Sequence, residues 1–132
     1  MTMDLADRLE LHELPARYGD LIDARDWDGL SRIFVDEATF EVPDQVMQGL
    51  EAIREFMLGA RHPRTHLMTN VHVDETPDGV ILHSRLIAMR RDGRFFSGHY
   101  RDVVEKRAEG WRVVTRVYTA TPYEEPPGPT LI

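Results

Sequence analysis

Asp23 and His66 are the two residues that the sequence best equips for chemistry. Asp23 ends an amphipathic helical segment, and His66 opens an apolar, strand-like run. A carboxylate bonded to one imidazole nitrogen fixes the tautomer, so the second nitrogen can accept a proton. Imidazole suits this work because its reference pKa is about 6.5. If the fold brings the two side chains together in a pocket, we expect a proton-transfer enzyme.

Each of these residues also has a simpler explanation. Asp23 could be an exposed turn residue beside Arg25, and a lone histidine on a strand is most often structural. Tyr18 lies five residues before Asp23 on the same helical segment. It is either a core aromatic at helical spacing or a phenol that donates a hydrogen bond to a carbonyl or a leaving group.

Seven further residues are candidates for substrate contact, either as apolar lining or as polar groups on the expected strands: Phe40, Met57, Met68, Arg90, Tyr100, Asp102 and Trp111. Tyr100 and Asp102 share one face of a strand, and His99 and Arg101 share the other. The alternation alone leaves open which pair faces a cavity.

Metal and cofactor chemistry has little support in the sequence. His62 and His66 are four residues apart, which is a metal-binding spacing on a helix, but Pro63 and the strand pattern argue against a helix there. The chain has no cysteine. It also has no Gly-rich phosphate loop, nucleophile elbow or dinucleotide-binding motif. We therefore expect neither a metal nor a cofactor.

Composition bounds the class of protein. The 132 residues fit one domain over 1–132, and the hydrophobic fraction of 42% is typical of a folded protein. A formal net charge of −7 argues against nucleic acid and anionic membrane surfaces as partners. The lack of cysteine, of a signal-like N-terminus and of a long apolar run indicates a cytoplasmic protein.

Hydrophobic periodicity predicts helices first and strands afterwards. Asp4 and Asp26 are expected to cap two of the helices, and Pro15 predicts a kink or two helices in line. The expected helices cover residues 4–24, 27–34 and 50–60. A short strand is expected over 38–42, a loop over 43–49, a meander of four antiparallel strands over 65–74, 80–91, 94–107 and 111–120, and an irregular Pro-rich tail over 121–132.

This order of elements indicates an α+β fold, with helices on one face of a twisted sheet that curls around them. The open end of such a sheet is a natural pocket. Its outer face would carry apolar residues, namely Leu67, Val71, Val73 and Ile87 or Met89, depending on the strand phase. An exposed apolar face favours a homo-oligomer, and both dimer and trimer fit.

The chain resembles the SnoaL-like branch of the nuclear-transport-factor-2-like superfamily. The matching segments span most of the chain in the right order: 16–23 (ARYGDLID), 26–30 (DWDGL), 49–53 (GLEAI), 65–70 (THLMTN), 97–102 (SGHYRD) and 110–113 (GWRV). The resemblance implies a cystatin-like fold, in which a cone-shaped, curved mixed sheet packs on three N-terminal helices.

Within that superfamily the chain looks most like scytalone dehydratase, bile acid dehydratase and hexachlorocyclohexane dehydrochlorinase. These enzymes use an Asp–His pair without cofactor or metal, and the resemblance places the pair at Asp23 and His66, with Tyr18 matching a tyrosine of the bile acid enzyme. Where some of these lyases carry a further His or Asp, this chain has Met89 or Arg90.

The sequence thus predicts a cofactor-free lyase or isomerase that acts on a small, apolar, cyclic or carbonyl-bearing substrate. One alternative is a polyketide-cyclase-type enzyme in which an acid such as Asp102 works alone. Another is a non-catalytic module that binds a small molecule or serves in assembly. Contact between Asp23 and His66 in a sheltered site would favour the first of the three.

Overall fold

The first helix, α1 (Leu5–Asp23), begins where the sequence predicts. The Asp4 side chain accepts a hydrogen bond of 2.8 Å from the backbone N–H of Asp7, which satisfies one of the free donors at the helix start. The computed structural model describes residues 3–122 and 128–129. α1 continues through Pro15 as one element, so the chain does not form two helices in line there.

Two shorter helices follow. Residues Trp27–Arg32 form a 3₁₀ helix, η1, and the Asp26 side chain caps it by accepting a 3.1 Å hydrogen bond from the N–H of Gly29. α2 (Leu50–Gly59) buries Ile53 and Met57 against the core. The three expected helices and both Asp caps are therefore confirmed, with the second helix of the tighter 3₁₀ type.

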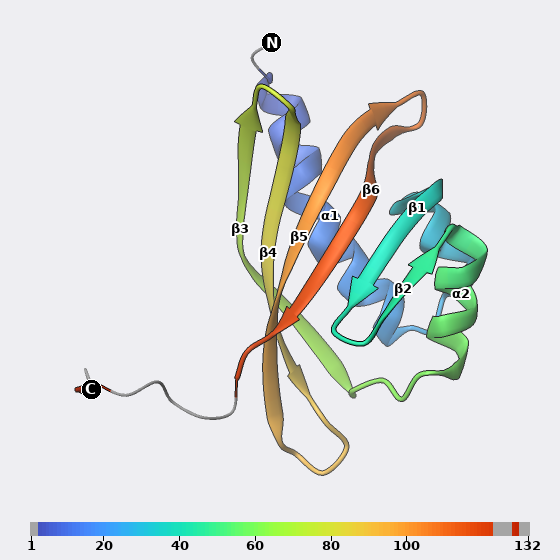
Figure 1. The fold of residues 1–132 in the computed structure, drawn as a ribbon, viewed down its shortest axis with the longest axis vertical. Coiled ribbons are helices and arrows are strands. Elements are labelled where there is room, and N and C mark those ends of the chain that lie inside the picture. Colours follow the sequence, from blue (N-terminus) through green and yellow to red (C-terminus); the bar gives the residue numbers. More distant parts are fainter. Residues whose placement is uncertain (1–2, 123–127, 130–132) are drawn as a thin grey trace.

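The strands form one mixed sheet of six, in the order β2-β1-β6-β5-β4-β3 (Figure 1). Every neighbouring pair is antiparallel except β1 and β6, which run parallel. The strands are β1 (Phe34–Val42), β2 (Gln45–Gln48), β3 (Thr65–Thr76), β4 (Gly79–Met89), β5 (Phe95–Arg107) and β6 (Gly110–Ala120). The meander of four strands is confirmed, whereas the expected loop over 43–49 contains the short edge strand β2.

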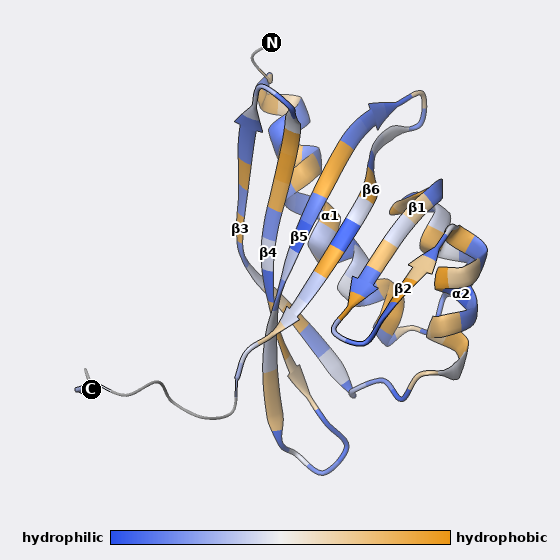
Figure 2. Cartoon of the chain, in the orientation of Figure 1, coloured by the Kyte–Doolittle hydropathy of each residue, from blue (hydrophilic) through white to orange (hydrophobic). Residues whose placement is uncertain are grey.

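The core lies between α1 and the inner face of the curved, unclosed sheet. Along β4 to β6, apolar and polar residues alternate, as Figure 2 shows by its change of colour along these strands. The inner face of β4 carries Leu82, Leu86 and Ala88, which are at most 2% exposed, and Leu11 of α1 is fully buried. This is the predicted α+β architecture, with helices on one face of a curled sheet.

A bulge in β3 changes which residues face the core. The register with β4 shifts between Thr69 and His72, and Asn70 within the bulge has a positive φ of 52°. Val71 and Val73 pack against the core, so their expected place on the outer face is wrong. The alternation read from the sequence holds before the bulge and is reversed after it.

Leu67 and Ile87 are cross-strand partners on the outer face and are 58% and 40% exposed, as expected. The homo-oligomer that this apolar surface suggests stays a prediction. No helix in the described part of the chain is long and apolar enough to cross a membrane. The predicted Pro-rich tail over 121–132 lies mostly outside the described residues.

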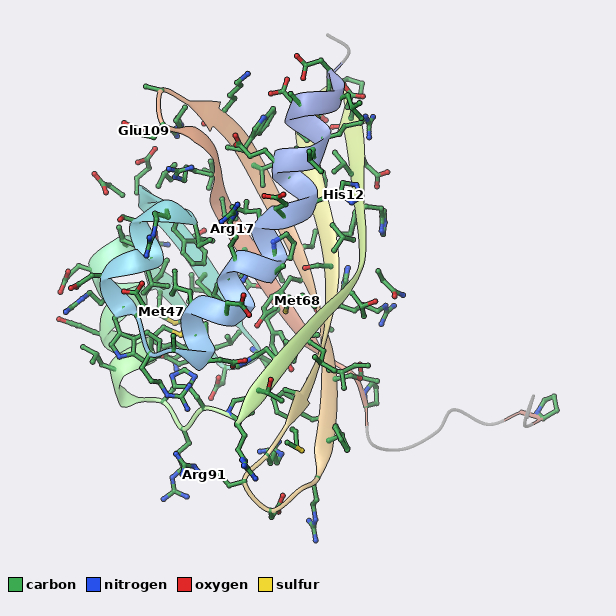
Figure 3. All side chains as sticks on the ribbon, turned by 180° about the vertical axis from the view of Figure 1, so that it is seen from behind. His12, Arg17, Met47, Met68, Arg91 and Glu109 are labelled. Atoms are coloured by element: carbon green, nitrogen blue, oxygen red, sulfur yellow. The ribbon has the colours of Figure 1, made fainter. Side chains whose placement is uncertain are left out.

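Gly19 allows α1 to approach β3 closely. A Cβ at this position would lie 3.1 Å from Cγ of Met68 and 3.6 Å from Cβ of His66. Figure 3 shows Met68 on β3 beside the helix. The missing side chain therefore brings the last turn of α1, with Asp23, next to the start of the strand that carries His66.

Replacing Gly19 with valine should separate these two elements. The added methyl groups have no room against Met68, and overpacking of this kind lowers the free energy of unfolding by about 1–3 kcal/mol. Urea denaturation followed by circular dichroism measures the change.

Gly59→Val is the matched control, since Gly59 ends α2 and a Cβ there meets nothing within 4 Å. Equal stability of the Gly19→Val and Gly59→Val proteins would contradict the proposed close approach.

Candidate active site

Asp23 and His66 are in direct contact. Nδ1 of His66 lies 2.6 Å from Oδ1 of Asp23. The other carboxylate oxygen, Oδ2, accepts hydrogen bonds from the backbone N–H of His66 at 3.0 Å and from Oγ1 of Thr65 at 3.2 Å. The end of α1 is thereby tied to the first two residues of β3, and the carboxylate cannot turn without breaking these bonds.

This contact sets the state of the imidazole. An ionised carboxylate only accepts hydrogen bonds, so Nδ1 of His66 carries the proton and Nε2 of the neutral ring holds a lone pair. Nε2 has no hydrogen-bond partner among the described residues. The side chains of His66 and Asp23 are 7% and 23% exposed. His66 is therefore an oriented imidazole in a sheltered position.

A pocket of about 660 Å³ opens at the same end of the sheet. Arg25 follows Asp23 by two residues, and Phe96 lies abreast of Ala88, which pairs with His66. Asp23 and His66, which we call the dyad, are not part of the lining. The lining consists of Arg25, Ala60, Arg61, His62, Pro63, Arg90, Arg91, Asp92 and Phe96.

Phe96 stands two strands from His66 on the inner face, which corresponds to about 10 Å at the usual strand spacing. His62, another lining residue, donates a hydrogen bond from Nε2 to the carbonyl oxygen of Met57 over 2.7 Å, and its ring centre lies 5.1 Å from that of Trp27 at a tilt of 38°. Burial lowers the pKa of His62, and the positive charge of Arg25 lowers it further, against the opposing effect of the hydrogen bond to Met57. His62 is thus held neutral close to the dyad.

The core contains a buried ion pair that packs against Tyr18 of α1. Arg116 is 1% exposed and binds the carboxylate of Asp102, itself fully buried, through two hydrogen bonds of 2.8 Å. Burial disfavours the guanidinium charge, but Asp102 outweighs this and raises the pKa of Arg116 above its ordinary value. Nη1 of Arg116 has no hydrogen-bond partner among the described residues.

Aromatic rings enclose this guanidinium. Its carbon lies 4.0 Å from the ring centre of Tyr100 and 4.3 Å from that of Tyr18, so two phenol faces stabilise the charge. Tyr18 and Tyr100 are 2% and 5% exposed, and they meet edge to face at 5.7 Å. Burial raises the pKa of both phenols, so each keeps its proton and acts as a neutral hydroxyl.

The phase of β5 is now decided, because Tyr100 and Asp102 face the core and His99 and Arg101 face outward. Asp102 is bound by Arg116 and has no exposed surface, which conflicts with its expected place in contact with substrate.

The sequence also wrongly predicts Trp111 as a substrate contact. Its indole donates to Asp7 near the start of α1, about 24 Å along the helix from Asp23.

The remaining expected residues divide between core and pocket. Phe40 and Met57 are 3% exposed and form packed core, whereas Met68 is partly buried beside Gly19. Arg90 lines the pocket, and its guanidinium carbon lies 4.5 Å from the centre of the Phe96 ring.

Several pocket residues were missed from the sequence. Arg25 and His62 are only two and four positions from the predicted dyad, so sequence proximity was an available signal. Phe96 had no such signal in the sequence, because only its pairing with Ala88 across β4 and β5 places it at the pocket.

The chain belongs to the SnoaL-like domain family, whose profile matches residues 3–117. An uncharacterised protein of Mycobacterium tuberculosis is 28% identical over 131 residues, covering 88% of this chain and 86% of that protein. The family agrees with the resemblance found in the sequence.

Solved structures confirm the fold. A protein of unknown function with a cystatin-like fold from Nostoc punctiforme has a TM-score of 0.82 and 23% identity, covering 93% of this chain and 97% of its own. A nuclear-transport-factor-2-like protein from Novosphingobium aromaticivorans has a TM-score of 0.78 and 25% identity, covering 91% of this chain and 85% of its own. A scytalone dehydratase-like protein of the same organism has a TM-score of 0.71 and 20% identity, covering 84% of this chain and 81% of its own.

Replacing Asp102 with asparagine should destabilise the fold. It leaves the Arg116 guanidinium buried without its counter-charge, a change that costs about 3–5 kcal/mol. Chemical denaturation measures the loss. Asp92→Asn is the control, since Asp92 lies on an exposed turn. Unchanged stability of Asp102→Asn would show that the ion pair is not buried in this way.

The buried phenols predict loss of stability in alkali. Their pKa values are raised in the folded state, so unfolded tyrosine ionises first, at a pH of about 10. Their stabilisation is full below that pH and is lost as the pH rises through it. Urea midpoints between about pH 9 and about pH 11 measure this slope. Tyr18→Phe should flatten it, and an unaltered slope would contradict the assignment.

Proposed function

We propose that this protein is a cofactor-free lyase or isomerase in which His66 removes a proton from a carbon next to a carbonyl group. The observation that carries the proposal is the 2.6 Å contact between Asp23 and His66, with the imidazole 7% exposed. Asp23 holds Nδ1–H and stabilises the imidazolium that forms when Nε2 takes the substrate proton. No electron carrier is needed for such a step.

The pocket indicates what the substrate looks like. Its volume of about 660 Å³ suits a small organic molecule. Phe96 offers an apolar wall, while the arginines of the lining outnumber its one acid, Asp92. We infer a substrate with an apolar, cyclic body and an oxygen-rich or negatively charged end that lies toward these arginines. Tyr18 has no part in the lining: it is 2% exposed, and its ring lies against the Arg116 guanidinium.

The structure disfavours the lone-acid alternative. Asp102 is fully buried and both of its oxygens bind Arg116, so it has no free oxygen for a substrate. The likeness to a scytalone dehydratase-like protein supports elimination chemistry in this fold. A non-catalytic binding module differs from the proposal only in turnover, so the experiment must measure proton transfer itself.

Deuterium exchange tests proton abstraction without knowledge of the natural substrate. With 2-tetralone as the probe in D₂O, the wild-type protein should speed loss of the α-proton signal in NMR spectra. His66→Ala should lower the catalysed rate by about 10²–10⁴-fold, the usual contribution of a general base. Asp23→Asn should also lower it, because the amide no longer stabilises an imidazolium.

His12→Ala is the matched control, because His12 is an exposed histidine of α1 away from the pocket (Figure 3). It should exchange the probe at the wild-type rate. A folded His66→Ala protein that retains the wild-type rate refutes the proposal. Saturable binding of the probe with no catalysed exchange would favour the binding module instead.

A further inference from the structure

A second group of histidines lies on the face of the sheet opposite the dyad. The His72 and His83 rings stack at 4.5 Å between centres, and the His83 and His99 rings at 5.5 Å. These residues come from the adjacent strands β3, β4 and β5 (Figure 1), and along these strands they alternate with core residues such as Leu82 and Tyr100. Asp74, two residues after His72, completes the group.

The donor atoms of three of these residues converge. One nitrogen from each of His72 and His83 and one carboxylate oxygen of Asp74 all lie within 4.8 Å of one another. Nε2 of His83 is 3.1 Å from Oδ2 of Asp74. We propose that His72, Asp74 and His83 bind a divalent first-row transition metal ion of the zinc type, at a site separate from the dyad.

The outer contacts of both imidazoles fit this role. Nδ1 of His72 lies 3.1 Å from the carbonyl oxygen of Asn70, so it donates there and leaves the lone pair on Nε2. Metal-binding histidines usually donate their second N–H to a carbonyl or similar acceptor in this way, which fixes the tautomer.

His83 is oriented in the same manner by His99. Its Nδ1 lies 3.3 Å from Nε2 of His99. Nε2 of His83 donates to the Asp74 carboxylate over 3.1 Å. A metal ion bound between these two atoms would replace that proton, and Nδ1–H of His83 would then donate to Nε2 of His99.

Closing the site requires only small movements of surface side chains. Ligands around tetrahedral zinc stand about 3.3 Å apart, given bond lengths of about 2.0–2.1 Å. The observed spread of up to 4.8 Å must therefore shrink, and the stacked rings must splay. His72 and Asp74 are exposed, with the Asp74 side chain 56% exposed, so both have room to rotate.

The surroundings predict which ions bind. Arg85 and Arg101 lie on the same face, each two residues from the histidine of its own strand. Because these charges oppose a cation, the ion must be held by strong bonds to imidazole nitrogen. Zn²⁺, Co²⁺, Ni²⁺ and Cu²⁺ form such bonds, whereas Ca²⁺ and Mg²⁺ prefer several oxygen ligands. The site should therefore reject the latter two.

Competition against a chromophoric chelator measures Zn²⁺ binding to the full, tag-free chain. We expect one ion per chain, unaffected by excess Ca²⁺ or Mg²⁺. His72→Ala and Asp74→Ala should each weaken binding at least about 10-fold, and His99→Ala by about 10–100-fold through loss of orientation. His12→Ala, an exposed histidine on α1, should leave it unchanged.

NMR of the imidazole nitrogens supplies a readout on the unaltered protein. Zn²⁺ should shift the signals of His72 and His83, while those of His12 and His66 stay in place. The proposal is overturned by wild-type Zn²⁺ affinity in the His72→Ala and Asp74→Ala proteins, by shifts confined to other histidines, or by equal displacement with Ca²⁺. Because the readouts do not involve turnover, failure here leaves the dyad proposal intact, and the reverse also holds.

Discussion

The Asp23 carboxylate is the constraint on which the site depends. It closes α1 onto the first residues of β3 by accepting from Thr65 Oγ1, His66 N and His66 Nδ1. A negative charge at a helix C-terminus is unfavourable by about 0.3–1 kcal/mol, and three hydrogen bonds to an ionised group more than offset it. The same atoms fix the helix on the sheet and orient the imidazole, so fold and chemistry are not separable here.

The buried ion pair of Arg116 and Asp102 bounds the inner side of the fold. Arg116, Asp102 and the rings of Tyr18 and Tyr100 fill the inner part of the curved sheet with a packed polar centre. None of these four residues lines the pocket of about 660 Å³, which lies beside the end of α1. The ion pair and the rings packed on it give the inner sheet a wall of fixed side chains.

Because of its bulge, β3 places one histidine on each face of the sheet. Before the bulge at Asn70, β3 directs His66 toward α1, and after it β3 directs His72 to the outer surface. An unbroken alternation would have placed both histidines on the same side, since their numbers differ by an even count. The extra residue thus separates the dyad from the histidines of the outer face.

The sequence by itself determined the local features: the helix starts at Asp4 and Asp26, the turns of the meander, the family, and Asp23 and His66 as candidates for a pair. These depend on contacts between near neighbours or on motifs, which a linear chain displays. Only the tertiary structure decided that Asp102 pairs with Arg116, that Trp111 lies far from the dyad, and that Phe96 reaches the pocket. Those outcomes depend on strand register, bulges and burial, which arise from contacts between residues distant in the chain and therefore leave no local pattern.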